Sequence, residues 1–444
     1  MPTPLAAALL RARSDEAPGP DLPHRPAAGP ALRGLPVPLA LDPLLRHSLA
    51  GGRRRPVPSA GALHPVRVRL LAGTGSGVPP GQYAYDPRTH RLHPIGPAPR
   101  PAPPGAFAVV GVAPEATVAH YRHRAWPLTL LDAGHAVASL VAAGAPAYCL
   151  DLAADGLPAA DPPRAVGAGD VLAETAGAVP LAVVRLTRTG ILSAWPRRAA
   201  HGRAGAAHHP ADPRHPDLAQ ARHALSLVAA AGSRHGTWRT VPSRAPLSVV
   251  LRRRSAPLTT LAAATRPDDD ALGQVLATAR AAAAGGPRWY VAVGGDRPGL
   301  LTARTRGAAG LRTVATGPVL PTLAAWAAGQ GWLARTGAVL LAVGCPTGAP
   351  PARIRRDHLL AGYGVGHAQL AATALGLSAR PVGSWQCADL GAAIGGPAGD
   401  GWVLHALAVG APPPRRRPAP APDTSRRDGP VVPGPRTAEE HHAA

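Results

Sequence analysis

The stretch from Arg53 to Pro65, Arg-Arg-Arg-Pro-Val-Pro-Ser-Ala-Gly-Ala-Leu-His-Pro, has the residue types of a site for a flat ligand. Pro58 fixes one backbone torsion, and Ser59, Ala60 and Gly61 add almost no side-chain bulk. A planar molecule can therefore lie close to the backbone N–H and C=O groups of these residues. The same composition is also typical of a plain turn between a helix and a strand.

A second motif follows, Gly-Gln-Tyr-Ala-Tyr-Asp-Pro-Arg-Thr-His over residues 81–90. Together and in this order the two motifs resemble the FMN-dependent nitroreductase superfamily. The closest branch is that of the SagB/McbC-type dehydrogenases, which oxidise azolines to azoles in ribosomally made peptides and whose usual wording is close to PSAGALYP and GLYxYDPxxH. The resemblance covers most of residues 46–190 and, more loosely, 246–411. It implies FMN as cofactor, a modified precursor peptide as substrate and a cyclodehydratase as partner.

The composition indicates how many domains the chain can form and which kinds of partner it favours. The chain has 444 residues, of which 46% are apolar, enough for two domains with cores of their own. All 47 basic residues are arginine, and the formal net charge is +22. These arginines are scattered and no aromatic platform accompanies them. An acidic leader peptide or a phosphate is therefore a more economical partner than nucleic acid or a membrane.

Cysteine usage and apolar runs bear on the compartment. Cys149, Cys345 and Cys387 have no metal-like spacing and form no even set, which favours a reduced, cytoplasmic protein. The apolar run Leu5–Leu10 has no preceding positive charge and does not resemble a signal peptide. The stretch Val319–Val343 is interrupted by polar residues and glycines, and it indicates a helix, a turn and a strand rather than a membrane span.

Hydrophobic periodicity and breakers divide the chain into five segments. These are a Pro-rich segment over 1–45, a first domain over 46–199, a connector over 200–245, a second domain over 246–411 and a disordered tail over 412–444. Helices are predicted over 5–13, 39–49, 129–143, 217–231, 268–284 and 357–375. Strands are predicted over 66–71, 81–85, 106–112, 179–186, 289–293, 339–343 and 402–409.

The connector is rich in histidine, which raises the question of a metal site. Its spacing matches no standard site and no set of carboxylates accompanies it, so a linker is favoured over a metal centre. The histidines concerned are His201, His208, His209, His215 and His223.

Two short signatures recur in the same order in both predicted domains. Leu-Arg-Ala-Arg-Ser over 10–14 is echoed by Leu-Arg-Arg-Arg-Ser over 251–255. Gly134-His135-Ala136 is echoed by Gly366-His367-Ala368, and a further glycine follows ten residues after the first one in each copy. Together they predict two tandem nitroreductase-like domains of α+β class, each with a mainly antiparallel sheet flanked by helices, that form a pseudo-dimer within one chain. A monomer would then suffice, although a homodimer stays open.

The resemblance also implies how one FMN site would be divided between the two domains. In the superfamily, basic residues and a serine of one subunit hold the phosphate, and the Pro-Ser stretch of the other lies along the flavin ring. Here the phosphate set is Arg253, Arg254 and Ser255 with Arg416 of the terminal cluster, and the ring set is Pro58, Ser59, Ala60 and Gly61. The loop that faces flavin N5 in the family falls at Gly383 and Ser384. The second half-site would be lost.

Arg252–Arg254 have an alternative interpretation as an exposed helix start without a ligand. Cations at a helix N-terminus oppose the helix dipole unless an anion is bound, so the phosphate interpretation is favoured. For the terminal cluster of Arg416, a solvated tail is nearly as good an account.

If flavin binds, the reaction is hydride transfer, and azoline oxidation also needs a base that takes the Cα proton. Where the azoline-oxidising branch has a Lys-Tyr pair, this chain has His120-Tyr121. His120 would be the base and Tyr121 would relay or position it. The loss of lysine puts azoline oxidation in doubt. An NAD(P)H-dependent nitro or quinone reductase and a catalytically degenerate flavin-binding scaffold are the alternatives.

Overall fold

The computed structural model describes the chain in ten stretches. These are residues 3–23, 34–52, 55–144, 152–153, 178–190, 195, 215–231, 238–239, 245–304 and 310–412. We call the described residues up to 239 the first half and those from 245 to 412 the second half. Contacts divide the chain only at Pro412, so both halves belong to one compact unit.

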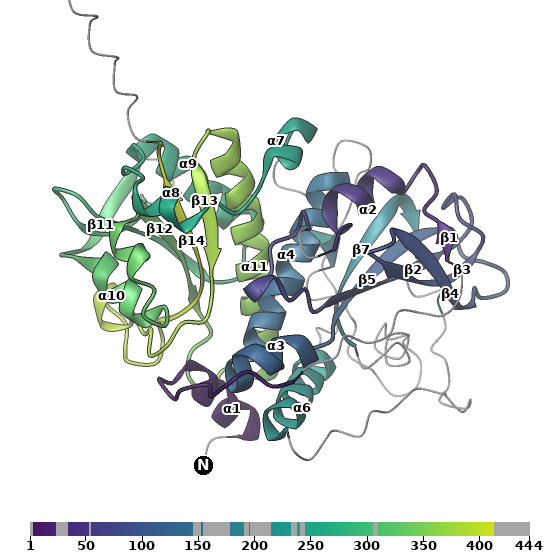
Figure 1. The fold of residues 1–444 in the computed structure, drawn as a ribbon, viewed down its shortest axis with the longest axis horizontal. Coiled ribbons are helices and arrows are strands. Elements are labelled where there is room, and N and C mark those ends of the chain that lie inside the picture. The colour runs from purple at the N-terminus through teal and green to yellow at the C-terminus, as the bar shows by residue number, and fades with distance from the viewer. Residues whose placement is uncertain are drawn as a thin grey trace, which may run out of the picture. The chain divides into compact units, whose positions relative to one another are not determined.

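The first half is built on an antiparallel sheet with strand order β1-β4-β3-β2-β5-β7-β6-β8 (Figure 1). Its strands are β1 Leu35–Pro36, β2 Val66–Ala72, β3 Gly81–Asp86, β4 Arg91–Pro97, β5 Gly105–Val112, β6 Leu152–Ala153, β7 Val179–Gly190 and β8 Trp238–Arg239.

The second half is built on an antiparallel sheet with strand order β11-β10-β9-β12-β14-β13. Its strands are β9 Arg288–Val293, β10 Gly299–Ala303, β11 Leu311–Thr316, β12 Ala338–Gly344, β13 Ser378–Val382 and β14 Trp402–Gly410. The order β4-β3-β2-β5-β7-β6 in the first sheet follows the same path, since β2 corresponds to β9 and β5 to β12. In each half a long helix connects the central strand to the next one.

These long helices are α4 and α11, which lie side by side between the two sheets (Figure 1). The described helices are α1 Pro4–Arg13, α2 Asp42–Ser48, α3 Glu115–Tyr121, α4 Ala125–Gly144, α6 Pro216–Ala230, α7 Leu247–Arg252, α8 Leu258–Ala262, α9 Asp269–Ala282, α10 Val319–Trp326 and α11 Pro351–Ala374. Short 3-10 turns are η1 Ala60–Ala62, η2 Arg122–Arg124, η4 Gly331–Arg335 and η5 Ala392–Ile394.

The central strands show why these sequences form fully buried sheets. Along β12, Ala338, Leu340 and Ala342 face the core that contains α4 and α11, whereas Val339 and Leu341 face α10 and η4. Side chains alternate between the two faces of a strand, so a continuous apolar run is what a strand covered on both faces requires. The second half therefore has three layers, with helices on both faces of its sheet.

The contact between α4 and α11 is made by backbone rather than by side chains. A Cβ at Gly134 would overlap the carbonyl oxygen of Leu359, and a Cβ at Gly362 would overlap that of Leu131. The two contacts are reciprocal, as they are across a two-fold axis. In this contact Gly134 faces Gly362. Gly366, its expected equivalent, lies four residues, about one helical turn, further along α11 and against Ala138.

The other echo is wrong as a guide to equivalent positions. Each signature, residues 10–14 and residues 251–255, contains the end of a helix, but α1 packs mainly on η2 and α6, whereas α7 packs on α4 and α11. Figure 1 shows α1 and α7 at opposite ends of the α4–α11 pair. The shared strand order, and not these short signatures, relates the two halves.

Most predicted elements lie where periodicity placed them, with ends that differ by a few residues. The prediction that Arg252–Arg254 begin a helix was wrong: Arg252 is in the last turn of α7 and Arg253 is its C-cap, so these arginines end a helix. Cations favour a helix C-terminus, and the dipole argument for a bound anion therefore fails. The strands β4, β10, β11 and β13 were not predicted, whereas α10 and β12 lie in the stretch Val319–Val343, for which a helix, a turn and a strand were expected. His201, His208, His209 and the tail from residue 413 lie outside the described residues.

Among the described residues, one continuous helical stretch, Glu115–Gly144, is long and apolar enough to cross a membrane, but 89% of its apolar window is buried inside the protein. The stretch is therefore accounted for as the core helix that both sheets cover.

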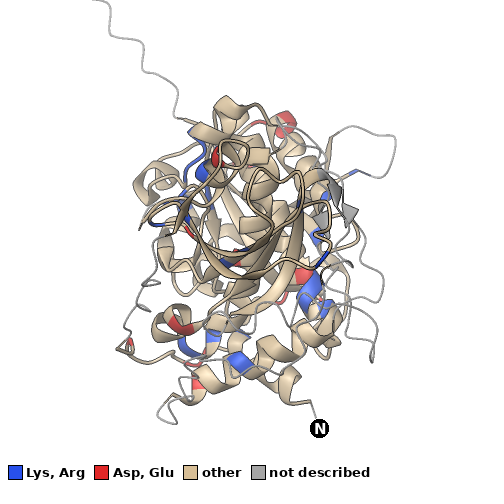
Figure 2. Ribbon diagram, turned by 90° about the vertical axis from the view of Figure 1, so that its right-hand side faces the viewer, with Lys and Arg blue, Asp and Glu red and all other residues tan. Residues whose placement is uncertain are grey.

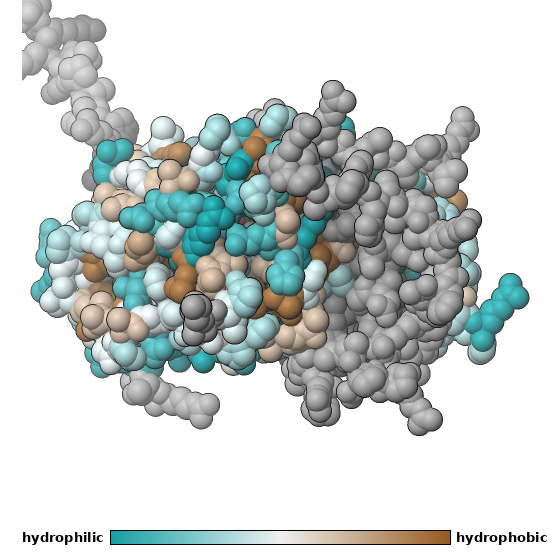
Figure 3. Space-filling model, turned by 90° about the horizontal axis from the view of Figure 1, so that it is seen from below, coloured by the Kyte–Doolittle hydropathy of each residue, from teal (hydrophilic) through white to brown (hydrophobic). Residues whose placement is uncertain are grey.

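Charge is distributed over the whole molecule. Figure 2 shows the charged residues of the described ribbon spread over many elements. On the face in Figure 3, the described hydrophilic residues alternate with small apolar patches.

Candidate functional site

The Pro58–Gly61 segment is docked onto α4 by a single carboxylate. The Ser59 hydroxyl donates to Oδ2 of Asp132 at 2.7 Å, and the Ala60 N–H donates to Oδ1 at 3.1 Å. Ser59 Oγ in turn accepts from the N–H of His64 at 2.9 Å. Gly61 has φ +57°, a left-handed conformation that glycine adopts without strain. The segment is thus held in one conformation by contacts that involve almost no side-chain bulk.

Asp132 was missed by the sequence reasoning. It is 3% exposed, and burial raises its pKa to about 7, although its hydrogen bonds with Ser59 and Ala60 act in the opposite direction. A sequence signal for it existed: a lone acid stands between Leu131 and Ala133 in an otherwise apolar helical run. A buried acid needs partners, and such a residue marks a place where another segment supplies them.

Tyr121 reaches the same segment from the C-terminal end of α3. Its hydroxyl oxygen lies 3.2 Å from the place a Cβ would take on Gly61. Burial, and then the nearby Asp132, raise the pKa of Tyr121, so its hydroxyl keeps its proton at neutral pH. The structure brings Tyr121 and Gly61, which the sequence reasoning had named as site residues, together with Asp132, which it had not.

His120 points elsewhere. Its side chain is 48% exposed, and Nδ1 lies 3.0 Å from the carboxylate of Asp21. The ring packs edge-on against Tyr121 with centroids 4.6 Å apart. His120 can therefore act on the Pro58–Gly61 segment only through Tyr121.

Arg253 crosses from the second half to the first. Its guanidinium donates to the carbonyl oxygen of Pro56 and, at 3.1 Å, to Oε1 of Gln369 on α11. Burial lowers its pKa to about 10, which still leaves it cationic at neutral pH. Both partners are neutral, and no carboxylate of the described residues pairs with Arg253. A partly buried cation with neutral partners favours an anion beside it.

A small cavity adjoins this guanidinium, with walls from both halves. The walls are His47, Pro56, Pro58, Ala138, Ser139 and Ala142 of the first half and Val250, Arg253, Gly366, Gln369 and Leu370 of the second. Arg254 is exposed, and only its carbonyl oxygen meets Gln369, at 3.3 Å. Ser255 is half-buried. Of the predicted phosphate set, the structure thus brings Arg253 to Pro58, while Arg416 lies outside the described residues.

The Gly383–Ser384 loop belongs to the second half and lies against α4 of the first half. A Cβ at Gly383 would be 3.1 Å from Leu128 of α4, and Ser384 has φ +64°, a strained value for a non-glycine residue. Behind the loop, His405 Nδ1 lies 3.0 Å from the carbonyl oxygen of Val382 and so donates to it. His405 Nε2 then accepts from Nε2 of His135, at 2.7 Å. This pair ties α4 to the sheet of the second half.

No protein-family model matches the chain, and no curated protein matches it. A solved structure does: a nitroreductase from Anabaena variabilis aligns with a TM-score of 0.60 at 17% identity, covering 84% of this chain and 88% of its own. That share is too large for one half alone. The chain has a nitroreductase fold.

A second solved structure is the E. coli microcin synthetase McbBCD complex with truncated pro-MccB17 bound. One of its chains aligns over 40% of this chain and 77% of its own, at 17% identity and a TM-score of 0.27, a score too low to bear on the argument. Among the described residues of this nitroreductase fold, no group of three or more His, Cys, Asp or Glu side chains is placed to hold a metal ion.

Proposed function

We propose that the chain is an FMN-dependent oxidoreductase whose cofactor site is shared by the two halves. The nitroreductase fold supports an oxidoreductase. The observation that carries the shared site is the contact between Arg253 of the second half and Pro56, two residues before the Pro58–Gly61 segment. Neither half holds both the partly buried cation and the small-residue segment.

The two halves themselves support an origin in one duplicated fold. Their six shared strands have one order, and α4 and α11 meet through reciprocal glycine contacts. Reciprocal contacts are what an isologous dimer interface contains. We therefore infer an intramolecular pseudo-dimer, with the cofactor site at the contact between the copies.

The donor set around Arg253 fits the phosphate end of FMN. A phosphate monoester carries nearly two negative charges, and a guanidinium offers forked donors to its oxygens. Ser139 adds a hydroxyl to the cavity wall, while Ala138, Ala142 and Gly366 leave the wall free of bulk. We propose that Arg253 holds the phosphate and that Pro58–Gly61 lies against the ring.

When bound, the flavin would supply the hydride chemistry, and this chain would supply positioning and proton handling. Asp132 fixes Ser59 and Ala60. Tyr121, protonated at neutral pH, would donate a hydrogen bond from its hydroxyl rather than remove a proton. His120, through its edge contact with Tyr121, would orient that hydroxyl.

For the substrate we propose an azoline in a ribosomally made peptide, as the Pro-Ser-Ala-Gly and Tyr-Asp-Pro motifs indicate. The cytoplasm would be the compartment, and a cyclodehydratase the supplier of the azoline. A second candidate, an NAD(P)H-dependent reductase of nitroaromatics or quinones, is favoured by the name of the aligned Anabaena variabilis structure.

The deciding experiment is the absorbance spectrum of the purified chain with FMN quantified after heat release. About one FMN per chain is expected. Arg253→Gln should weaken FMN binding about tenfold or more, because a charged hydrogen bond is lost. Arg252→Gln, an exposed arginine one position earlier, is the matched control and should bind as the parent does. Equal loss in both variants, or no flavin at all, would overturn the shared site.

The substrate is then decided by two assays on the flavin-loaded protein. Conversion of an azoline peptide to the azole, two mass units lighter, supports the dehydrogenase. Steady NADH consumption with a nitroaromatic acceptor supports the reductase. Tight FMN with neither activity identifies a flavin-binding scaffold.

A further inference from the structure

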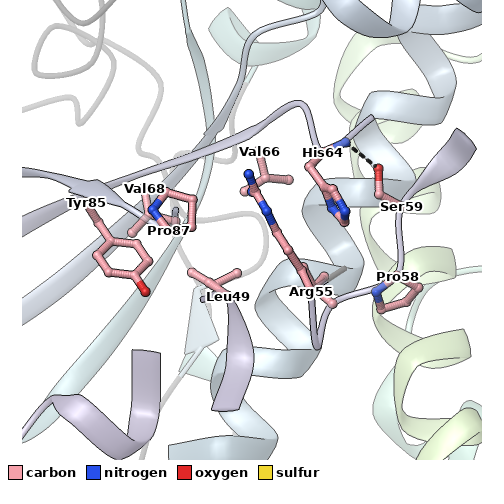
Figure 4. Close-up of a pocket in the computed structure, with 10 residues that line it drawn as sticks. Leu49, Arg55, Pro58, Ser59, His64, Val66, Val68, Tyr85 and Pro87 are labelled. Carbon is pink, nitrogen blue, oxygen red and sulfur yellow. Dashed lines mark hydrogen bonds between the residues drawn. The ribbon is translucent and has the colours of Figure 1, made fainter. Parts of the chain in front are cut away.

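A second cavity lies on the far side of Pro58, within the first half. Its walls come from the end of α2, the segment 55–59 and strands β2 and β3 (Figure 4). The lining residues are Leu49, Arg55, Val57, Pro58, Ser59, His64, Val66, Val68, Tyr85 and Pro87. The second half contributes none of them, so this cavity is separate from the one beside Arg253.

Arg55 is the charged group of this cavity. Figure 4 shows its side chain extended between Tyr85 on one side and His64 on the other. Its Nε donates to the carbonyl oxygen of Gly52 at 3.2 Å, and among the described residues no carboxylate pairs with it. Burial, with the nearby Arg67, lowers its pKa to about 10, so it is cationic at neutral pH. A partly buried cation without a counter-ion favours an anion in the cavity.

Tyr85 is held in place by a chain of hydrogen bonds that the Tyr-Asp-Pro-Arg-Thr-His motif builds. Its hydroxyl lies 2.8 Å from Nδ1 of His90, and Nε2 of His90 lies 2.8 Å from Oδ1 of Asp42. Arg46 pairs with the same carboxylate, and it lowers the pKa of Asp42 to about 2. Asp42 is thus ionised at neutral pH and accepts the Nε2–H of His90. The motif thereby fixes the ring of Tyr85 on the cavity wall.

The remaining wall is apolar, with Leu49, Val57, Val66 and Val68 among its members. Among the residues that line the cavity, Arg55 alone carries a permanent charge. One guanidinium balances one negative charge, whereas a phosphate would bring nearly two into an apolar wall. A carboxylate carried on a small apolar group matches both the charge and the lining.

We propose that this cavity binds a carboxylate on a small branched apolar group, with Arg55 as its counter-ion and the Tyr85 ring as part of the apolar wall. The site does not depend on the proposed flavin. Pro58 and Ser59 of the flavin segment form part of its wall, so its occupant would touch that segment directly.

The test is calorimetric titration of the full chain with 3-methylbutanoate, with its amide and with inorganic phosphate. The carboxylate should bind, and the amide and phosphate should bind at least about tenfold more weakly, since each lacks the charge match. Binding of the amide as tight as that of the carboxylate, stronger binding of phosphate, or no heat with any of them would overturn the proposal.

Variants place the binding in this cavity. Arg55→Gln should weaken carboxylate binding about tenfold or more, and Arg55→Lys, which keeps the charge, should recover part of it. Arg88→Gln removes an exposed arginine next to the lining Pro87 and should change affinity less than about twofold. Thermal unfolding checks that each variant is folded. If Arg55→Gln fails to fold, a loss in Arg88→Gln equal to that in Arg55→Lys counts against the proposal.

Discussion

Gly134 of α4 and Gly362 of α11 meet backbone to backbone: a Cβ on Gly134 would lie 3.0 Å from the Cα of Gly362. The contact is reciprocal, since each glycine also faces the carbonyl oxygen that lies three residues before the other one, Leu359 or Leu131. Side chains as small as alanine do not fit. This contact sets the distance between the two halves, and with it the place of Arg253 beside Pro56.

Gly134→Ala and Gly362→Ala should each destabilise the chain by about 1 to 3 kcal/mol or more, because overpacking forces the two helices apart. Urea unfolding measures the change. Gly273→Ala on α9 is the matched control, since a Cβ there meets nothing within 4 Å. It should stabilise the helix by about 0.5 to 1 kcal/mol. Equal behaviour of Gly134→Ala and Gly273→Ala would contradict the close contact.

Asp132→Asn should flatten the pH dependence of stability. The pKa of Asp132 in the folded chain, about 7, lies above the value of about 3.9 for an unfolded aspartate. The contribution of Asp132 to the free energy of unfolding is therefore fully present below pH 4 and is lost as the pH rises through 7. Asn cannot ionise, so the variant should gain on the parent between pH 5 and pH 8, by on the order of 4 kcal/mol at most. Unfolding in urea at several pH values measures this, and parallel curves would contradict it.

The buried histidines change the stability of the chain with pH in the direction opposite to that of Asp132. Burial lowers the pKa of His358, His367 and His405 to about 4, and that of His135 well below its ordinary value. As the pH falls, these histidines bind protons in the unfolded chain before they do so in the folded chain. Their contribution to the free energy of unfolding is therefore fully present above pH 6.5 and is lost as the pH falls toward 4.

His405→Gln should lower stability at pH 7.5, since the bond to His135 is lost, and should lose less than the parent on going to pH 5. His223→Gln, on the exposed surface of α6, is the control. A loss between pH 7.5 and pH 5 as steep as that of the parent would contradict a neutral buried His405.

Tyr121→Phe should leave FMN content unchanged and lower turnover by about a hundredfold, because the hydroxyl beside Gly61 no longer donates a hydrogen bond to the reacting group. His120→Gln should cost far less, because His120 acts only through the ring of Tyr121 and its side chain is 48% exposed. Single-turnover kinetics on flavin-loaded protein separate chemistry from binding. A larger loss in His120→Gln than in Tyr121→Phe would return the role of base to His120.

The sequence predicted the buried strands β5 and β12 because each is a continuous apolar run. Periodicity failed for β10, β11 and β13, each five or six residues long and only partly apolar, where pairing with a neighbouring strand and not local pattern decides the structure. Motif reasoning placed Arg253 beside the Pro58–Gly61 segment although 195 residues separate Arg253 from Pro58. Its dipole argument for that placement was wrong, since α7 ends there.

The partner of Ser59 could not be read from spacing. Asp132 lies 73 residues away on a helix whose register against the segment is a tertiary property. The repeated Gly-His-Ala triplet also shows that sequence spacing alone does not reveal which residues meet in the fold. In a chain this rich in alanine and glycine, identical triplets arise by chance, and the backbone contact joins Gly134 to Gly362 rather than to Gly366.

The glycine contact between α4 and α11 joins two copies of one strand order within a single covalent chain. Two separate subunits part on dilution, whereas here each half keeps its neighbour at a fixed and high effective concentration. A substitution in this chain also changes one half only. Arg253 and Pro58–Gly61 can thus change independently of the other half, whereas a substitution in a homodimer appears in both subunits.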